Sequence, residues 1–372
     1  MQSMNKNKIS PELLNNVSVM DSNHTDYIFV NSNDFWLTKK FLDKYHYKYI
    51  PYKFANCFAL NADFDDISIL SNQENVKYIH SNPLVKIQQT QMENMNLSRL
   101  TQNNFLGQGQ TICFIDTGIF PHFDFLYPKN RIIKFIDLIN HNPTPYDDNG
   151  HGTFVSGIAC GNGIMKNSNI GFAPRANIIS IKALGKNGNS NSNTILDAMQ
   201  WVYENHKVYN ISVVCMSFGA EILANNDPLS NGAEALWKRG IIVVAAAGNS
   251  GPEKNTIKSP GNNPHIITVG ALDESSMQTA DFSSRGPTIY GHKPDLLAPA
   301  VNIISCDNRL PPYTNMSGTS VATPIIAGIC ADIKSRWPDI TNNEIKKFLL
   351  SHCKKITGDI DIEGAGYITF NI

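Results

Sequence analysis

Three short segments, far apart in the chain, each carry a residue type that acyl-transfer chemistry uses. Asp116 ends the apolar run Phe114-Ile-Asp, and His151 stands between two glycines. Ser320 lies in Asn315-Met-Ser-Gly-Thr-Ser-Val-Ala-Thr, directly before an apolar helical pattern. Hydrolysis of an amide near neutral pH requires a nucleophile, a base that deprotonates it and a group that orients the base. Serine, histidine and aspartate can supply these roles.

A fourth segment, Val244-Ala-Ala-Ala-Gly-Asn-Ser-Gly, could supply a donor for the oxyanion of such a reaction. Small side chains at the end of a strand let a substrate backbone lie close, and the side-chain amide of Asn249 can donate a hydrogen bond. Taken singly, each segment also has a structural interpretation. Asp116 could cap a turn, Asn249 could belong to an Asn-Ser-Gly turn, and Ser320 could be a plain helix N-cap.

In this order, the segments DTG, DDNGHGT, AAGNSGP and GTSVATP resemble the motif set of the subtilisin-like serine proteases, the subtilases. The chain order Asp, His, Ser is also the subtilisin order, whereas α/β-hydrolases and chymotrypsin use other orders. The resemblance runs from about Gly107 to Tyr367. The chain looks most like the cytosolic, AprX-type bacterial members of the family.

The resemblance implies a role for each residue of the set. Ser320 would be the nucleophile, His151 the general base and then acid, and Asp116 the group that orients His151. Asn249 and the Ser320 N–H would form the oxyanion hole. The implied activity is that of an endopeptidase acting on peptides or proteins. The alternative is a catalytically silent pseudoprotease that acts as a binding or regulatory protein.

The resemblance also assigns a substrate cleft, in which an extended peptide pairs with one backbone segment opposite residues 188–190. Small residues would wall the S1 pocket, which holds the P1 residue on the amino side of the cleaved bond. Lys258, near the floor of S1, is expected to disfavour basic P1 residues and to admit acidic ones; the alternative is a solvated surface lysine. The residues assigned to the cleft are Ser217, Phe218, Gly219, Gly188, Ala246, Ala247, Gly248 and Lys258.

No cofactor is required for the chemistry that the resemblance implies. Residues 158–174 cannot be matched to the tight calcium loop of the family, so the resemblance does not decide whether a structural calcium ion is bound. Asp147 and Asp148, which precede His151, are expected to cap the following turn rather than bind a metal. The metal ligands are therefore left open.

The pattern of residues 91–372 predicts an α/β domain that could bring the chemical groups together. Mostly apolar runs of strand length suit a parallel sheet covered on both faces, and amphipathic stretches between them predict helices. Thr341 and Glu344 form a capping box at the start of one such helix. The fold class is therefore a doubly wound parallel-sheet domain. The predicted strands cover residues 111–115, 178–183, 211–216, 241–247, 266–271 and 301–305.

Residues 23–90 predict a separate α+β unit in the order β-α-β-β-α-β, a split βαβ or ferredoxin-like arrangement. Its first helix has Leu37, Phe41 and Tyr45 at four-residue steps. Family propeptides are similar in this order, so we expect a prodomain that acts as intramolecular chaperone and inhibitor until autoprocessing between about Lys86 and Ser98. A permanently attached regulatory module is the alternative. Residues 1–22, polar and Asn-rich, are expected to form a flexible arm.

Composition narrows the choice of partners and compartment. The formal net charge of −1 gives no basic surface for nucleic acid. The sequence has neither an apolar run long enough for a membrane span nor the apolar core of a signal peptide. Seven widely spaced cysteines, an odd number, are expected to be reduced core residues. We therefore expect a cytoplasmic protein.

Overall fold

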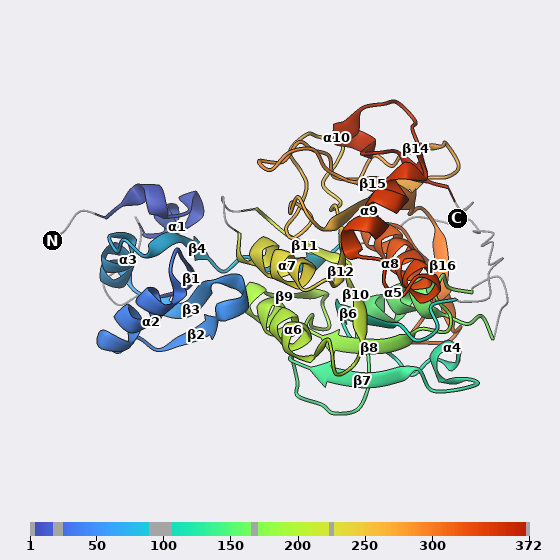
Figure 1. Cartoon of the computed structure of the whole chain (residues 1–372), viewed down its shortest axis with the longest axis horizontal. Helices are drawn as coiled ribbons and strands as arrows, with labels where there is room; N and C mark the ends of the chain where they lie inside the picture. Colours follow the sequence, from blue (N-terminus) through green and yellow to red (C-terminus); the bar gives the residue numbers. More distant parts are fainter. Residues whose placement is uncertain (1–3, 18–24, 89–105, 165–169, 223–226, 370–372) are drawn as a thin grey trace.

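Two lobes of unequal size make up the chain in its computed structural model (Figure 1). The structure describes residues 4–17, 25–88, 106–164, 170–222 and 227–369. The small lobe holds the N-terminal elements, and the large lobe holds the elements that follow residue 105.

A ten-stranded sheet forms the centre of the large lobe. Its strands are β6 (Thr111–Asp116), β7 (Ile132–Asp137), β8 (Asn177–Lys182), β10 (Ile211–Met216), β12 (Ile242–Ala246), β13 (Ile267–Asp273), β14 (Gln278–Thr279), β15 (Leu296–Pro299), β18 (Cys353–Lys354) and β19 (Tyr367–Ile368). The order is β18-β19-β15-β13-β12-β10-β6-β8-β7, with β14 beside β13. Neighbours are parallel except at β14 and β18. The expected parallel-sheet core is present.

Five of the six predicted strands belong to this sheet, and the central strands β6, β10 and β12 are buried at every position. The prediction for residues 301–305 was wrong about the sheet. There, β16 (Ile303–Cys306) pairs with β17 (Tyr313–Met316) in a separate antiparallel ribbon. Asn302, with φ +56°, turns the chain just before β16 and away from the parallel sheet.

Helices lie on both sides of the sheet (Figure 1). On one side, α5 (His151–Cys160) and α8 (Thr319–Arg336) pack against each other, and α8 also packs on β10, β12 and β13. On the other side, α6 (Ser192–Asn205) and α7 (Pro228–Lys238) form a second pair. α9 (Asn342–Ser351) begins with the predicted capping box of Thr341 and Glu344. Short helices α4 (Phe123–Leu126) and α10 (Ile360–Glu363) complete the lobe.

The small lobe contains a four-stranded antiparallel sheet in the order β2-β3-β1-β4. Along the chain its elements are β1 (Asp26–Ser32), α2 (Phe35–Lys44), β2 (Tyr49–Tyr52), the 3₁₀ turn η2 (Lys53–Ala55), β3 (Cys57–Ala62), α3 (Phe64–Ser71) and β4 (Val76–Ser81). α2 buries Phe35, Thr38 and Leu42. The predicted stripe lies elsewhere on the helix, and Leu37 and Tyr45 are exposed.

The described part of the N-terminal segment, residues 4–17, packs on the small lobe, so the prediction of a flexible arm was wrong there. It forms the 3₁₀ turn η1 (Lys6–Lys8) and α1 (Pro11–Val17). Ser10 N donates to Ile79 O at 2.9 Å, and Leu13 is fully buried in the lobe core. Ile9 is also buried in this core, and the burial of Ile9 and Leu13 stabilises the packing of the segment on the lobe despite its polar composition.

The small-lobe sheet uses its second face to contact the large lobe. Phe29 and Ala59 alternate with core residues of the small lobe and belong to the same buried cluster as the large lobe. Tyr52, also in that cluster, donates from its hydroxyl to Asp197 Oδ1 on α6 at 2.7 Å. The contact is therefore an apolar surface with a polar anchor.

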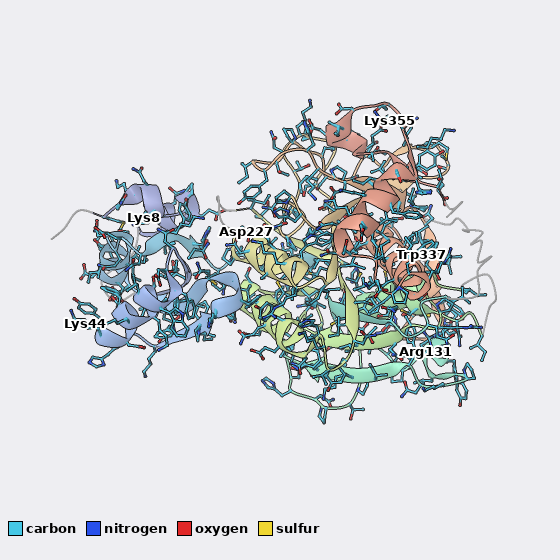
Figure 2. All side chains as sticks on the ribbon, viewed as in Figure 1. Lys8, Lys44, Arg131, Asp227, Trp337 and Lys355 are labelled. Atoms are coloured by element: carbon cyan, nitrogen blue, oxygen red, sulfur yellow. The ribbon has the colours of Figure 1, made fainter. Side chains whose placement is uncertain are left out.

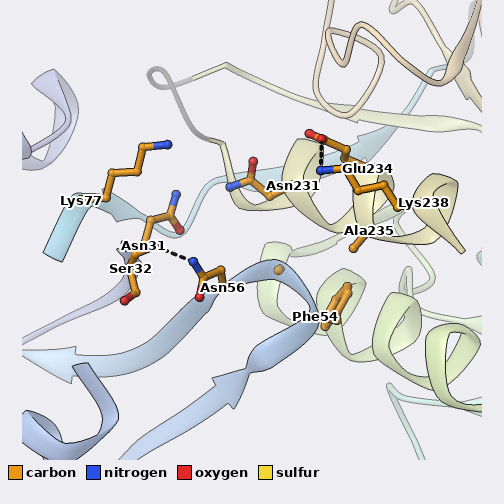
Figure 3. Close-up of a pocket in the computed structure, with 10 residues that line it drawn as sticks. Asn31, Ser32, Phe54, Asn56, Lys77, Asn231, Glu234, Ala235 and Lys238 are labelled. Atoms are coloured by element: carbon orange, nitrogen blue, oxygen red, sulfur yellow. Dashed lines mark hydrogen bonds and ion pairs between the residues drawn. The ribbon is translucent and has the colours of Figure 1, made fainter. Parts of the chain in front are cut away.

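Beside this contact lies a polar pocket of about 220 Å³ between the small lobe and α7 (Figure 3). Asn56 and Lys77 line it from the small lobe, and Asn231 and Glu234 from α7. Asp227, which caps α7, lies at the edge of the large lobe that faces the small lobe (Figure 2).

No helix in the described residues has both the length and the apolar character needed to span a bilayer.

Candidate active site

The structure brings Asp116 and His151 together at the carboxyl end of the parallel sheet. Asp116 is the last residue of β6, and His151 is the first residue of α5. His151 Nδ1–H donates to Asp116 Oδ1 at 2.8 Å, and both side chains are buried. Gly150, with φ +105°, turns the chain into α5. A Cβ on Gly152 would collide with the Gly118 carbonyl oxygen, so glycine is required for this close approach.

Asp147 holds the turn that carries His151. Its carboxylate accepts hydrogen bonds from Gly150 N at 2.8 Å, Thr153 N at 2.9 Å and Thr117 Oγ1 at 2.9 Å. It also accepts from Asn149 N and Thr153 Oγ1. It therefore caps the turn and ties it to the end of β6.

Asp148 does not cap the turn and instead pairs with a buried lysine. Its Oδ1 lies 2.6 Å from Lys182 Nζ, which also donates to Thr117 O and Leu184 O. Lys182 thus donates hydrogen bonds to two buried backbone carbonyl groups, one of which belongs to the residue after Asp116. The sequence analysis did not single out Lys182; a lysine at the end of an otherwise apolar strand was the available signal.

Ser320 is the second residue of α8, where free backbone N–H groups point outward. Its N–H donates to the carbonyl oxygen of Gln88 at 3.2 Å, and its Oγ donates to the same oxygen. Asn249 follows β12, and its Oδ1 accepts from Thr319 N and Thr319 Oγ1, both at 2.9 Å. These two bonds fix Oδ1 as the accepting end of the Asn249 amide, so its NH₂ group is the donor end.

The strand β5 (Leu84–Ile87) fills the cleft that leads to Ser320. It lies between β11 (Phe218–Ala220) and β9 (Asn189–Asn191), antiparallel to both. Ile87 N donates to Gly188 O at 2.9 Å, and Gln88 N donates to Ser217 O at 3.5 Å. The two segments assigned to the cleft thus lie on the two sides of an extended segment of the same chain.

The residues assigned to the S1 wall lie at the end of β12 and directly after it. Ala246 and Ala247 are buried, and Gly248 has φ +113°. Lys258 N donates to Ala247 O at 2.8 Å. Its Nζ lies 2.5 Å from Glu221 Oε1, and its side chain is only 11% exposed. Lys258 is therefore not a solvated surface lysine.

Burial sets the electrostatics around these groups. Among the described residues, the buried His151 Nε2 and Asp116 Oδ2 have no hydrogen-bond partner. Burial raises the pKa of the nearby Cys215 thiol, so a competing thiolate is disfavoured. Because Nδ1 donates to Asp116, Nε2 is the ring nitrogen whose lone pair is available.

Three buried residues in the described part of the chain could approach a metal ion: His122, Asp124 and Cys306. Their donor atoms already have partners. His122 Nδ1 accepts from Asp124 N at 3.1 Å, and the Asp124 carboxylate accepts from Tyr313 OH at 3.0 Å. The group is therefore a satisfied hydrogen-bond network. The stretch 158–174, where calcium was left open, includes residues 165–169, which lie outside the described residues.

Gln88 and Thr319 are site residues that the sequence did not reveal. Gln88 lies in the stretch between about Lys86 and Ser98 where we expected autoprocessing, but no local pattern singled it out, since its contact with Ser320 joins residues 232 positions apart. Thr319 directly precedes Ser320 in the motif GTSVATP, which was the signal that could have found it.

Comparison with known proteins agrees with this geometry. Residues 107–366 match the model of the subtilase family, Peptidase_S8. Serine protease AprX of Bacillus subtilis (strain 168) is 39% identical over 335 residues, which cover 81% of this chain and 75% of the relative. The thermostable alkaline protease of Halalkalibacterium halodurans is 32% identical over 289 residues, covering 76% and 73%. Subtilisin Savinase of Lederbergia lenta is 31% identical over 264 residues, covering 70% and 89%. The chain belongs to the subtilase family and is a subtilisin-like serine endopeptidase.

Proposed function

We propose that this endopeptidase works through an Asp116–His151–Ser320 triad and is made as a zymogen that processes itself. One observation carries the proposal: the Ser320 N–H and Oγ both donate to the carbonyl oxygen of Gln88. A carbonyl held in this way lies where a nucleophile and an oxyanion donor converge on one peptide group.

In the proposed mechanism, Ser320 Oγ attacks the carbonyl carbon of the substrate peptide and its proton passes to His151 Nε2. The carbon–nitrogen bond then breaks, and the leaving amine takes that proton. Water repeats the attack on the acyl-enzyme ester, which releases the carboxylate product and restores Ser320. Asp116 supports this role, because its hydrogen bond to Nδ1–H leaves Nε2 as the atom that accepts the proton.

The oxyanion of the tetrahedral intermediate would receive hydrogen bonds from Ser320 N–H and the Asn249 side chain. Two contacts support Asn249 in this role: Thr319 N and Oγ1 hold its Oδ1 and so orient the amide. The start of α8 adds the positive end of the helix dipole near the developing charge. None of these steps uses a cofactor, as is general for subtilases.

We further propose that residues 23–90 form the propeptide, a split βαβ or ferredoxin-like unit. The sheet order β2-β3-β1-β4 and the order of the elements along the chain support that assignment. Inhibition is supported by β5, which continues from the lobe into the cleft, and by the complete burial of Ser320 and His151. A permanently attached module is the alternative, and cleavage decides between them.

The proposed partners are peptide or protein substrates and the chain's own propeptide, and the proposed compartment is the cytoplasm. Reduced cysteines support that compartment, because none of the seven cysteines forms a disulfide in the part of the chain that the structure describes, and six are buried. The two-sided strand pairing of β5 supports extended peptide segments as the substrates.

The test compares the wild-type chain with Ser320→Ala. After incubation, the wild type should split into two fragments, and an active-site phosphonate should label Ser320 in the large fragment. Ser320→Ala should stay whole and unlabelled while keeping the wild-type circular dichroism spectrum. A chain that splits equally fast without Ser320, or a split wild type that neither takes the label nor degrades denatured protein, would contradict the proposal and favour the pseudoprotease alternative.

A further inference from the structure

Gln88 occupies the position of a P1 residue with its backbone and its side chain. Its carbonyl oxygen receives the two Ser320 hydrogen bonds, and its N–H donates to Ser217 O. The bond that follows, Gln88–Gln89, is therefore the one that Ser320 faces. Gln89 itself lies outside the described residues.

The side-chain amide of Gln88 has a partner at each end. Its Oε1 accepts from Asn249 N at 2.9 Å, and its Nε2 donates to Lys86 O at 3.1 Å. Gln88 is 9% exposed, so these bonds are formed away from bulk water. The Gln88 amide thus meets one donor from the large lobe and one acceptor from the bound segment itself, which is the pattern that a neutral carboxamide requires.

Lys258 closes the floor of this pocket. A Cβ built on Gly219 would lie 2.7 Å from Lys258 Cβ, and one built on Gly248 would lie 2.5 Å from Lys258 Cγ. The lysine stem therefore passes between the two glycines of the S1 wall. The same Cβ on Gly219 would lie 3.3 Å from Gln88 Nε2, so the amide is next to this stem.

From these contacts we infer that the enzyme cleaves after glutamine, that its first cut is the Gln88–Gln89 bond, and that Lys258 sets this preference. The inference rests on the proposed function of the same site. The substrates are extended segments with glutamine at P1, bound like β5.

Other P1 residues fit the pocket less well. A glutamate would turn a carboxylate oxygen toward Lys86 O, which is itself an acceptor. A methionine of similar length would leave Asn249 N–H without its partner, which costs binding. A phenylalanine would meet the Lys258 stem, and a lysine would meet its positive charge. The earlier expectation that Lys258 admits acidic residues is therefore replaced by a preference for the neutral amide.

The first experiment locates the cut. Mass spectrometry of the processed wild type should give a large fragment that begins at Gln89, with allowance for loss of ammonia when an N-terminal glutamine cyclises. The second measures kcat/KM of the processed enzyme on Val-Lys-Ile-X-Gln peptides with Gln, Glu, Met or Phe at X. The Gln peptide should exceed each of the others by about tenfold or more, because at least one buried hydrogen bond or the pocket shape is lost.

Two lysine variants test the floor. Lys258→Ala should raise kcat/KM for the Phe peptide by about tenfold, because the stem no longer crosses the pocket. Lys254→Ala, at an exposed lysine of the same loop, should change no peptide. Phosphonate labelling of Ser320 serves as the reference for active enzyme in each sample.

The outcomes separate the two proposals. Fully labelled enzyme that makes its first cut elsewhere, or that cleaves all four peptides at equal kcat/KM, overturns the glutamine preference and leaves the triad standing. Processed enzyme that takes no label and cleaves no peptide overturns both. A Lys258→Ala variant that matches Lys254→Ala removes Lys258 as the residue that sets the preference.

Discussion

Tyr52→Phe should weaken the hold of the small lobe on the active site without changing either fold. The Tyr52 hydroxyl donates to Asp197 Oδ1 at 2.7 Å across the contact between the lobes, and Tyr52 is fully buried. Burial, together with the Asp197 charge, raises the pKa of Tyr52, so its hydroxyl stays protonated and remains a donor. The substitution removes this donor and keeps the ring.

The magnitude follows from the charge and exposure of the acceptor. A hydrogen bond to a charged group contributes about 1.5–3 kcal/mol, and tenfold in a dissociation constant corresponds to about 1.4 kcal/mol. Asp197 is half-buried, so water can solvate it partly once the donor is gone. We therefore expect the lower end of the range, a loss of about tenfold in the affinity of the cleaved small lobe for the enzyme.

The assay starts from the processed chain, in which we expect the two pieces to stay associated. Diluting this complex and following peptide cleavage gives the dissociation constant of the small lobe. Tyr47→Phe is the matched control, because its hydroxyl donates to Asp66 Oδ1 at 2.9 Å within the small lobe. If both variants release the lobe equally, or if Tyr52→Phe matches the wild type, the assignment of a polar anchor between the lobes is wrong.

Three further outcomes are expected. Burial raises the pKa of Asp197, so the associated state binds more protons and should loosen as the pH rises above about 4, the ordinary pKa of an aspartate. Asp197→Asn should flatten this dependence of the dissociation constant. Asp116→Asn should slow self-cleavage, followed on gels, by about 10⁴-fold, the scale found for the same carboxylate in subtilisin, a family member; a loss under tenfold would exclude its orienting role. Asp147→Asn should lower the free energy of unfolding by about 3 kcal/mol, measured with urea in the Ser320→Ala background. An amide oxygen cannot replace both carboxylate oxygens, so at least two hydrogen bonds to a charged group are lost. An unchanged unfolding transition would refute the role of Asp147 in holding the turn.

Local sequence was sufficient for the elements that carry the chemistry. Apolar runs of strand length predicted β6, β10 and β12, because a parallel sheet buried on both faces tolerates little else. Thr341 and Glu344 predicted their own capping box, which is a contact between residues three apart. The four motifs pointed to the family, and the family match from residue 107 to 366 confirmed it.

Patterns that depend on a distant neighbour could not be read in this way. Asn302 redirects the chain by its φ angle, so an apolar run became part of a separate ribbon. Residues 4–17 have the polar composition of a flexible arm, and only the structure shows that Leu13 is buried in the small-lobe core. On α2, the buried residues are Phe35, Thr38 and Leu42, because the position of the sheet that the helix covers determines which of its faces is buried.

The sequence by itself determined which residues have the chemistry that peptide hydrolysis needs, and which strands and helices carry them. Only the tertiary structure decided that Gln88 meets Ser320, that Lys258 closes a pocket between Gly219 and Gly248, and that Tyr52 meets Asp197. Motifs and hydrophobic periods are set by residues a few positions apart. These contacts instead join residues that are distant in sequence, brought together by the packing of one lobe on the other or by the folding of the large lobe, and no local pattern encodes that.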